Sequence, residues 1–126
     1  MNTDSLYREE IIDHYQNPRN FGKIDHADFH SRQTNPLCGD DIEMSIKWDP
    51  SASSGQAIKN ITFQGKGCAI CLAGASMLTE YAKGKRKKEL TKFSENDMLK
   101  LLGIEVSETR KKCAMLSLAV LKDCLY

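Results

Sequence analysis

A change of hydrophobic period divides most of this chain into a strand-forming part and a helix-forming part. From Asp41 to Trp48, apolar and polar residues alternate with a period of two, which indicates a half-buried β-strand. After the Gly65-Lys66-Gly67 turn, apolar residues between Ala69 and Ala82 recur about one helical turn apart, which predicts a helix. A run of strands followed by a run of helices is typical of an α+β domain.

Weaker signals supply the other strands and a first helix. A short amphipathic helix is predicted from Ser5 to Tyr15, and a weak strand is predicted around Asp28 to Thr34. The segment from Ile58 to Phe63 has β-branched and aromatic character, and it follows turn-forming residues at 49–55. We therefore expect it to pair with the preceding strand as an antiparallel hairpin with a long loop.

Two more helices are expected before the chain ends. Ser94 and Asp97 have the spacing of a capping box, and Gly103 is a plausible stop for the helix that they begin. A last helix is predicted from about Glu108 to Leu125. With 126 residues and 40% hydrophobic content, we expect a single domain over residues 1–126, with a small antiparallel three-stranded sheet and helices packed on one face.

The charge balance argues against a nucleic-acid partner. Eighteen basic and 17 acidic residues give a formal net charge of +1, whereas nucleic-acid binders carry a basic surface. One basic run, from Lys83 to Lys88, is interpreted as a solvated helix end or turn, with an acidic partner as the alternative. The N-terminal residues carry charges, and no apolar stretch approaches the roughly 20 residues that span a bilayer. We expect a cytoplasmic protein without membrane contact.

The five cysteines favour metal or thiol chemistry. An odd number of cysteines without a secretory signal does not predict a disulfide framework, because the cytosol keeps thiols reduced. The alternative is that they pack as small hydrophobic residues. The three histidines lack the paired spacing of a metal motif, and the sequence contains neither a nucleophile elbow nor a phosphate-binding loop.

Three cysteines stand out by their positions. Cys38 lies in a turn between Pro36 and Gly39, and Asp40 follows two residues later with a carboxylate oxygen. Cys68 lies at the expected start of a helix, where exposed amides favour a thiolate. Cys113 lies near the start of the last helix behind three basic residues, which would also favour its thiolate. Three thiolates and one carboxylate suit zinc or iron.

The other two cysteines are less informative. Cys71 forms a Cys-x-x-Cys pair with Cys68, and it could be an auxiliary ligand, a sulfur relay or a packed core residue. A zinc ribbon would need a second pair, which this chain lacks. Cys124, two residues before the end, is interpreted as an ordinary helix residue.

Several motifs resemble the iron-sulfur scaffold family of IscU, SufU and the N-terminal domain of NifU, over almost the whole chain. The motifs are Asn17-Pro18-Arg19-Asn20-Phe21-Gly22, Asn35-Pro36-Leu37-Cys38-Gly39-Asp40, Gly65-Lys66-Gly67-Cys68-Ala69-Ile70 and Lys112-Cys113-Ala114-Met115-Leu116-Ser117. Lys112 stands where IscU-type members have a histidine, so the site is most similar to SufU-type members. A shortened segment before Cys113 leaves the subfamily open.

The resemblance implies a site and a function. It implies that Cys38, Cys68 and Cys113 hold Zn²⁺ or a [2Fe-2S] cluster, accompanied by Asp40, and that a cysteine desulfurase and recipient apoproteins are partners. We predict a scaffold or sulfur acceptor, with Cys113 as the acceptor and with zinc-dependent sulfurtransferase activity as an option. The rival hypothesis is a zinc-stabilised module that binds a partner of the same pathway without cluster or sulfur chemistry.

Overall fold

Strands of the computed structural model form one three-stranded antiparallel sheet in the order β1-β2-β3. The structure describes residues 3–50 and 56–125. The strands are β1 (Phe29–Asn35), β2 (Asp40–Trp48) and β3 (Ile58–Lys66). All three predicted strands are confirmed, with ends that differ by up to three residues. The expected loop at 49–55 lies mostly outside the described residues.

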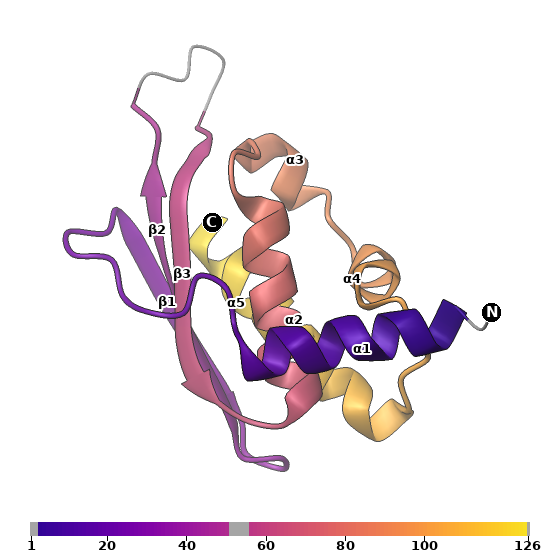
Figure 1. Cartoon of the computed structure of the whole chain (residues 1–126). Helices are drawn as coiled ribbons and strands as arrows, with labels where there is room; N and C mark the ends of the chain where they lie inside the picture. Colours follow the sequence, from indigo (N-terminus) through magenta and orange to yellow (C-terminus); the bar gives the residue numbers. More distant parts are fainter. Residues whose placement is uncertain (1–2, 51–55, 126) are drawn as a thin grey trace.

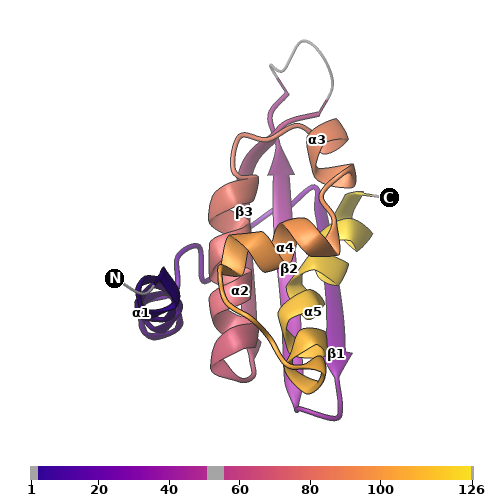
Figure 2. The same cartoon turned by 90° about the vertical axis from the view of Figure 1, so that its right-hand side faces the viewer.

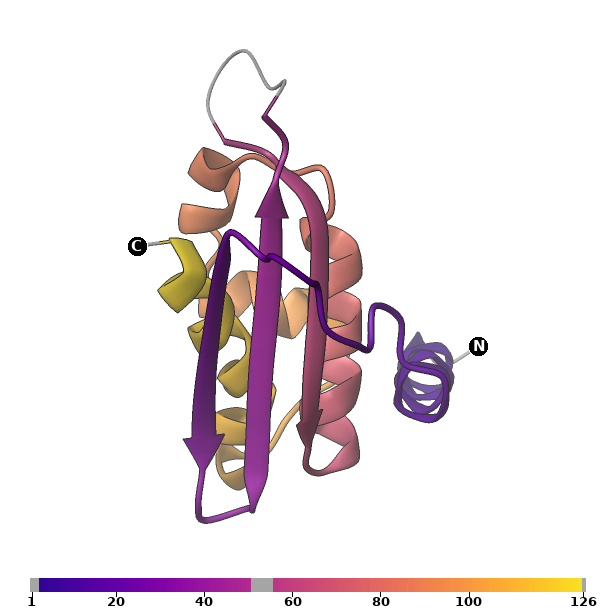
Figure 3. The same ribbon diagram turned by 90° about the vertical axis from the view of Figure 1, so that its left-hand side faces the viewer.

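The described part of the chain also contains five helices. They are α1 (Thr3–Gln16), α2 (Ala69–Ala82), α3 (Lys87–Thr91), α4 (Glu95–Leu102) and α5 (Glu108–Leu125). Helices α2 and α5 lie against one face of the sheet, and none of the helices in residues 3–50 and 56–125 covers the opposite face (Figures 2 and 3). The predicted α+β architecture, with helices on one face, is confirmed. No helix in the described residues is long and apolar enough to cross a membrane.

The core forms between the sheet and helices α2 and α5. The alternation in β2 directs Ile42, Met44 and Ile46 toward these helices, and all three side chains are fully buried. Ile61 and Phe63 of β3 extend the same buried layer. Burial on one face fixes the register of the sheet, because a slip of one residue would expose every apolar side chain of β2.

Helix α3 was not expected from the sequence. The basic run was interpreted as a helix end or turn, but its last residues begin a short helix that contains the fully buried Leu90. Lys122 of α5 donates from Nζ to the carbonyl oxygens of Leu90 and Thr91, at 3.0 and 2.7 Å. These long-range contacts stabilise a helix that is too short to persist from local propensity alone.

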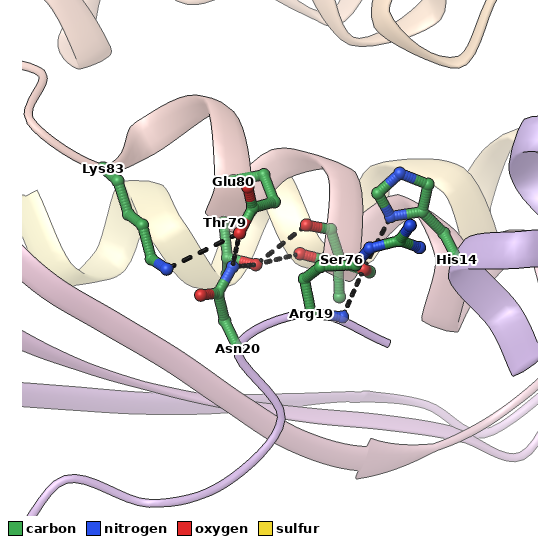
Figure 4. A network of polar contacts seen from close by, with 8 residues as sticks. His14, Arg19, Asn20, Ser76, Thr79, Glu80 and Lys83 are labelled. Carbon is green, nitrogen blue, oxygen red and sulfur yellow. Dashed lines mark hydrogen bonds and ion pairs between the residues drawn. The ribbon is translucent and has the colours of Figure 1, made fainter. Parts of the chain in front are cut away.

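Polar contacts hold α1 and the segment after it against α2 (Figure 4). Nδ1 of His14 lies 2.7 Å from Oγ of Ser76, which also accepts the backbone N–H of Arg19 at 2.9 Å. Nδ2 of Asn20 donates to Oγ1 of Thr79 at 3.1 Å and to the carboxylate of Glu80 at 2.9 Å. From there the chain crosses the helix-free face of the sheet on its way to β1 (Figure 3).

Candidate metal centre

Three segments that are distant in sequence meet at one end of the sheet (Figure 1). They are the turn between β1 and β2, the junction between β3 and α2, and the first turns of α5. The turn is closed by the N–H of Cys38, which donates to the carbonyl oxygen of Asn35 at 3.2 Å. Gly39 takes a φ of +68°, a left-handed conformation that favours glycine. This geometry places Cys38 at the surface, where its side chain is exposed.

Asp40 lies beneath this turn with only 1% of its surface exposed. Its Oδ1 accepts the backbone N–H of Cys68 at 3.1 Å, which satisfies an amide at the start of α2. Its Oδ2 is buried and has no hydrogen-bond partner among the described residues. Because a buried, unpaired carboxylate oxygen is costly, this atom fits a position beside a bound cation.

Gly67 keeps the space above this carboxylate open. A Cβ atom at residue 67 would lie 2.5 Å from Oδ1 of Asp40 and 3.2 Å from Sγ of Cys71. Both distances are too short for ordinary contacts, so any larger residue would displace the carboxylate. The glycine is therefore required by the close packing of Asp40 against the β3–α2 junction.

The candidate ligand atoms converge. One ligand atom each from Cys38, Asp40 and Cys113 lies within 4.8 Å of the others. Cys68 lies outside this tight group but beside it, because its backbone N–H donates to Asp40 and its thiol is close enough to help raise the pKa of Cys113. The structure thus brings three of the four predicted residues within 4.8 Å of one another, with Cys68 adjacent to them through its backbone N–H. A set of three sulfurs and one oxygen has the composition of a tetrahedral zinc site, and iron accepts the same ligands.

Cys113 differs from the expectation in two ways. It lies within α5 and is buried, with 1% of its surface exposed, although the sequence suggested an element boundary. Its pKa is raised, first by burial and then by Asp40 and the thiols of Cys38 and Cys68. The prediction that the preceding basic residues favour the thiolate is therefore wrong for the metal-free protein, because burial outweighs their charge. A metal that binds here must displace the thiol proton.

The two remaining cysteines lie in the core. Cys71 is 1% exposed, and burial, followed by the nearby charge of Asp40, raises its pKa. Cys124 is 2% exposed, and burial raises its pKa to about 12. Packing is thus the observed role of both side chains, as one of the alternatives for Cys71 anticipated. The group of converging ligand atoms in the described part of the chain contains no histidine.

Two residues of this end of the molecule were missed by sequence reasoning. Asn35 places its side-chain Nδ2 4.0 Å from Sγ of Cys113. Together with Cys38 and Lys112, it lines a hollow of about 340 Å³. Gly67 was interpreted as a turn residue, but its contact with Asp40 is specific to the site. The only feature of the sequence that pointed to Asn35 was its position directly before Pro36 in the turn that contains Cys38.

The fold and the site together define a small α+β domain in which two thiols and a carboxylate converge at one end of the sheet, with Cys68 next to them. The chain matches the family described as the NifU-like N terminal domain over residues 6–126. It therefore belongs to that family, and the resemblance drawn from its motifs is confirmed.

Curated relatives carry two kinds of name. The chain is 35% identical over 133 aligned positions to the zinc-dependent sulfurtransferase SufU of Bacillus subtilis, with 92% of this chain and 86% of the relative covered. It is 41% identical over 98 positions to the iron-sulfur cluster assembly scaffold protein IscU 1 of Archaeoglobus fulgidus. That match covers 78% of this chain but only 61% of the relative.

Solved structures show the same fold. One is described as an iron-sulfur cluster assembly scaffold protein of a SUF system from Fervidobacterium islandicum, with a TM-score of 0.80 and 26% identity. The match covers 99% of this chain and 100% of the chain in that structure. A nitrogen-fixing NifU-like protein (N-terminal) from Brucella abortus gives a TM-score of 0.74 at 19% identity, which supports the fold alone.

Proposed function

We propose that this protein assembles iron-sulfur clusters, as a scaffold, as an acceptor of sulfur from a cysteine desulfurase, or as both. The observation that carries the proposal is the convergence of Cys38, Asp40 and Cys113 within 4.8 Å, with Cys68 beside them. The names of the relatives support both roles, since one is a zinc-dependent sulfurtransferase and another a cluster scaffold.

The ligand set that we propose is Cys38, Cys68 and Cys113 with Asp40. These residues come from three parts of the fold: the β1–β2 hairpin supplies Cys38 and Asp40, the start of α2 supplies Cys68, and α5 supplies Cys113. Asp40 contributes an oxygen among sulfurs, and oxygen holds a soft metal less firmly than sulfur does. We therefore assign Asp40 as the exchangeable ligand, and the buried, unpaired Oδ2 supports its place in the ligand set. Zn²⁺, when bound, would keep the thiols deprotonated.

Exposure favours Cys38 as the first thiol to meet a donor. Cys38 is exposed and lines the hollow, whereas Cys113, the acceptor predicted from the sequence, is buried. In the transfer, the Cys38 thiolate attacks the outer sulfur of the donor's persulfide. A new S–S bond forms on Cys38, the donor's S–S bond breaks, and the donor cysteine leaves as a thiolate. The electrons balance without an external oxidant. Transfer to Cys113 would then be a second, internal exchange.

A desulfurase assay tests the sulfur-acceptor role. A cysteine desulfurase is assayed for alanine release with and without this protein, under reducing and anaerobic conditions. We expect faster turnover with the parent protein and no acceleration with Cys38→Ala. The Cys124→Ala variant is the matched control, because it removes a cysteine that lies outside the site.

Anaerobic reconstitution tests the scaffold role separately. The protein is incubated with Fe²⁺ and sulfide without oxygen, and its absorption spectrum and metal content are measured. We expect a bound [2Fe-2S] cluster or, in protein as isolated, zinc. If the protein neither accelerates a desulfurase nor binds a cluster, the proposal is contradicted. That result would favour the rival, a zinc-stabilised module that only docks on a partner. The cytoplasmic location stays a prediction that cell fractionation would test.

A further inference from the structure

Asn35 contacts the candidate centre through both its backbone and its side chain. It is the last residue of β1, and its register partner in β2 is Asp40. Its carbonyl oxygen accepts the N–H of Cys38, which closes the turn. The strand pairing and the turn together fix the direction in which its side chain leaves the sheet.

The Asn35 side chain reaches a sulfur that few polar groups can approach. Its Nδ2 lies 4.0 Å from Sγ of Cys113, a contact that joins β1 to α5. Cys113 is almost fully buried, so water gives its sulfur little solvation. The thiols of Cys38 and Cys68 and the carboxylate of Asp40 also act on this sulfur, because all three raise its pKa.

When the centre binds a metal, these thiols lose their ability to donate a hydrogen bond, whereas the Asn35 amide keeps it. Thiols give up their protons when they bind a metal, so Cys38 and Cys68 can no longer donate to the sulfur of Cys113. The amide of Asn35 keeps both of its protons at every pH in the working range. A thiolate is also a stronger acceptor than a thiol, because hydrogen bonds to charged groups are about twice as strong as neutral ones.

We propose that Asn35 is a positioning residue that donates an N–H···S hydrogen bond to the Cys113 thiolate of the loaded centre. The inference rests on the proposed function, since it requires Cys113 to be a ligand. Hydrogen bonds to ligand sulfurs reduce their electron donation to the metal and raise the reduction potential of iron-sulfur clusters. Asn35 thus tunes how tightly Cys113 holds its cargo without touching the metal.

Cobalt substitution tests this role without any activity assay. Co²⁺ is titrated anaerobically into the metal-free protein, and the near-ultraviolet charge-transfer bands from thiolate sulfur to cobalt are recorded. In Asn35→Leu, which has a similar volume but no donor, we expect these bands to move to longer wavelength, because the Cys113 sulfur becomes more electron-rich. A cluster assembled on the variant should also have a lower reduction potential than the parent.

Gln33→Leu is the matched control. Gln33 lies two residues earlier on β1, and its Nε2 donates to Asp123 at 2.7 Å and to the carbonyl oxygen of Ala119 at 3.5 Å, both on α5. This variant loses a β1–α5 amide contact but no contact to sulfur, so its cobalt spectrum should match the parent. Circular dichroism checks that both variants fold.

Three outcomes would overturn the inference. Bands of Asn35→Leu that coincide with those of the parent would show that the amide does not act on the sulfur. An equal shift in Gln33→Leu would assign the effect to packing between β1 and α5. A parent protein without thiolate-to-cobalt bands would refute the metal centre itself, and the role of Asn35 with it. This third outcome concerns the proposed function, whereas the first two outcomes concern only Asn35.

Discussion

Gly67 shows how one absent side chain preserves the candidate centre. In Gly67→Ala the new Cβ would lie 2.5 Å from Oδ1 and 3.1 Å from Cγ of Asp40. The carboxylate is buried and cannot swing into solvent, so it must shift from its position in the centre. We expect the variant to fold but to bind Zn²⁺ more than about tenfold more weakly, which corresponds to about 1.4 kcal/mol. Competition with a chromophoric chelator measures this affinity.

Gly74→Ala is the control for the glycine substitution. Gly74 lies in α2, and a Cβ there would meet Cε of Met98 at 3.2 Å, the mobile end of a flexible side chain. Alanine in a helix interior gains about 0.5–1 kcal/mol over glycine. We expect unchanged zinc affinity and little change in stability. Similar zinc affinities for the two variants would contradict the assigned role of Gly67.

The ligand set gives a second prediction at this scale. Cys38→Ala, Cys68→Ala and Cys113→Ala should each weaken metal binding severely, because a site that loses one of four ligands must recruit water. Cys124→Ala is the matched control for Cys113→Ala, since both thiols are buried on α5. Metal content after anaerobic purification measures the effect. Equal metal loss in Cys124→Ala would show that the ligands are misassigned.

The residues of the centre were predictable from sequence to different degrees. Cys38 and Asp40 stand two residues apart in a proline and glycine turn, so local sequence indicates both. The burial of Cys113 and its contact with Asn35 depend on how α5 packs against β1, across 78 residues of sequence. Local spacing cannot give such a contact. The same long-range packing reversed the expected direction of the Cys113 pKa shift.

At the scale of elements, the contact between α1 and α2 should depend on pH. Burial lowers the pKa of His14 from its ordinary value of 6.5, and the positive charge of Arg19 adds to this effect. The opposing charges of Glu10, Asp13 and Glu80 are weaker. Oγ of Ser76 accepts the N–H of Arg19 and can donate its own proton only to a neutral His14. The folded state therefore favours the neutral imidazole.

The sign of the effect follows from this lowered pKa. Above pH 6.5, the His14 side chain is neutral in both the folded and the unfolded chain, and the contribution of the contact is complete. As pH falls below 6.5, the unfolded chain takes up the proton first, so stability is lost until the pH has passed the folded-state pKa. We expect the Tm to fall over this range, and to fall less in His14→Gln. Thermal unfolding followed by circular dichroism measures both.

The exposed His30 provides the control for His14. It lies on β1, away from the contact between α1 and α2. His30→Gln should leave the contact between α1 and α2 intact, because it removes a histidine that takes no part in that contact. A pH dependence that is unchanged in His14→Gln would place the titrating group elsewhere.

Elements with strong local signals were predicted well. The bounds of α2 and α5 match the expectation, and α4 has the predicted capping box at Ser94 and the left-handed Gly103 at its end. Helix α3 was missed because its stability comes from the burial of Leu90 and the contact of Lys122 with its last carbonyl groups. Those interactions join segments about 30 residues apart, and no periodic pattern in the sequence predicts them.

For the whole molecule, the proposed ligands link three parts of the fold that are distant in sequence. Cys38 and Asp40 belong to the β1–β2 hairpin, Cys68 to the start of α2, and Cys113 to α5. An ion held by all four residues binds only the folded chain, so binding adds directly to the free energy of unfolding. The single domain expected from sequence should then unfold in one transition, with and without metal.

Zinc should therefore raise the Tm of the whole protein. At about a hundred times its Kd, a ligand that binds only the folded state adds about 2.7 kcal/mol, which for a domain of this size raises Tm by about 10 °C. Calorimetry of the metal-free protein with and without Zn²⁺ measures the increment. Cys124→Ala should retain it, whereas Cys113→Ala should lose most of it because the link to α5 is broken. An increment of full size in Cys113→Ala, or a separate transition that zinc leaves unmoved, would show that the ion does not join these three parts of the fold.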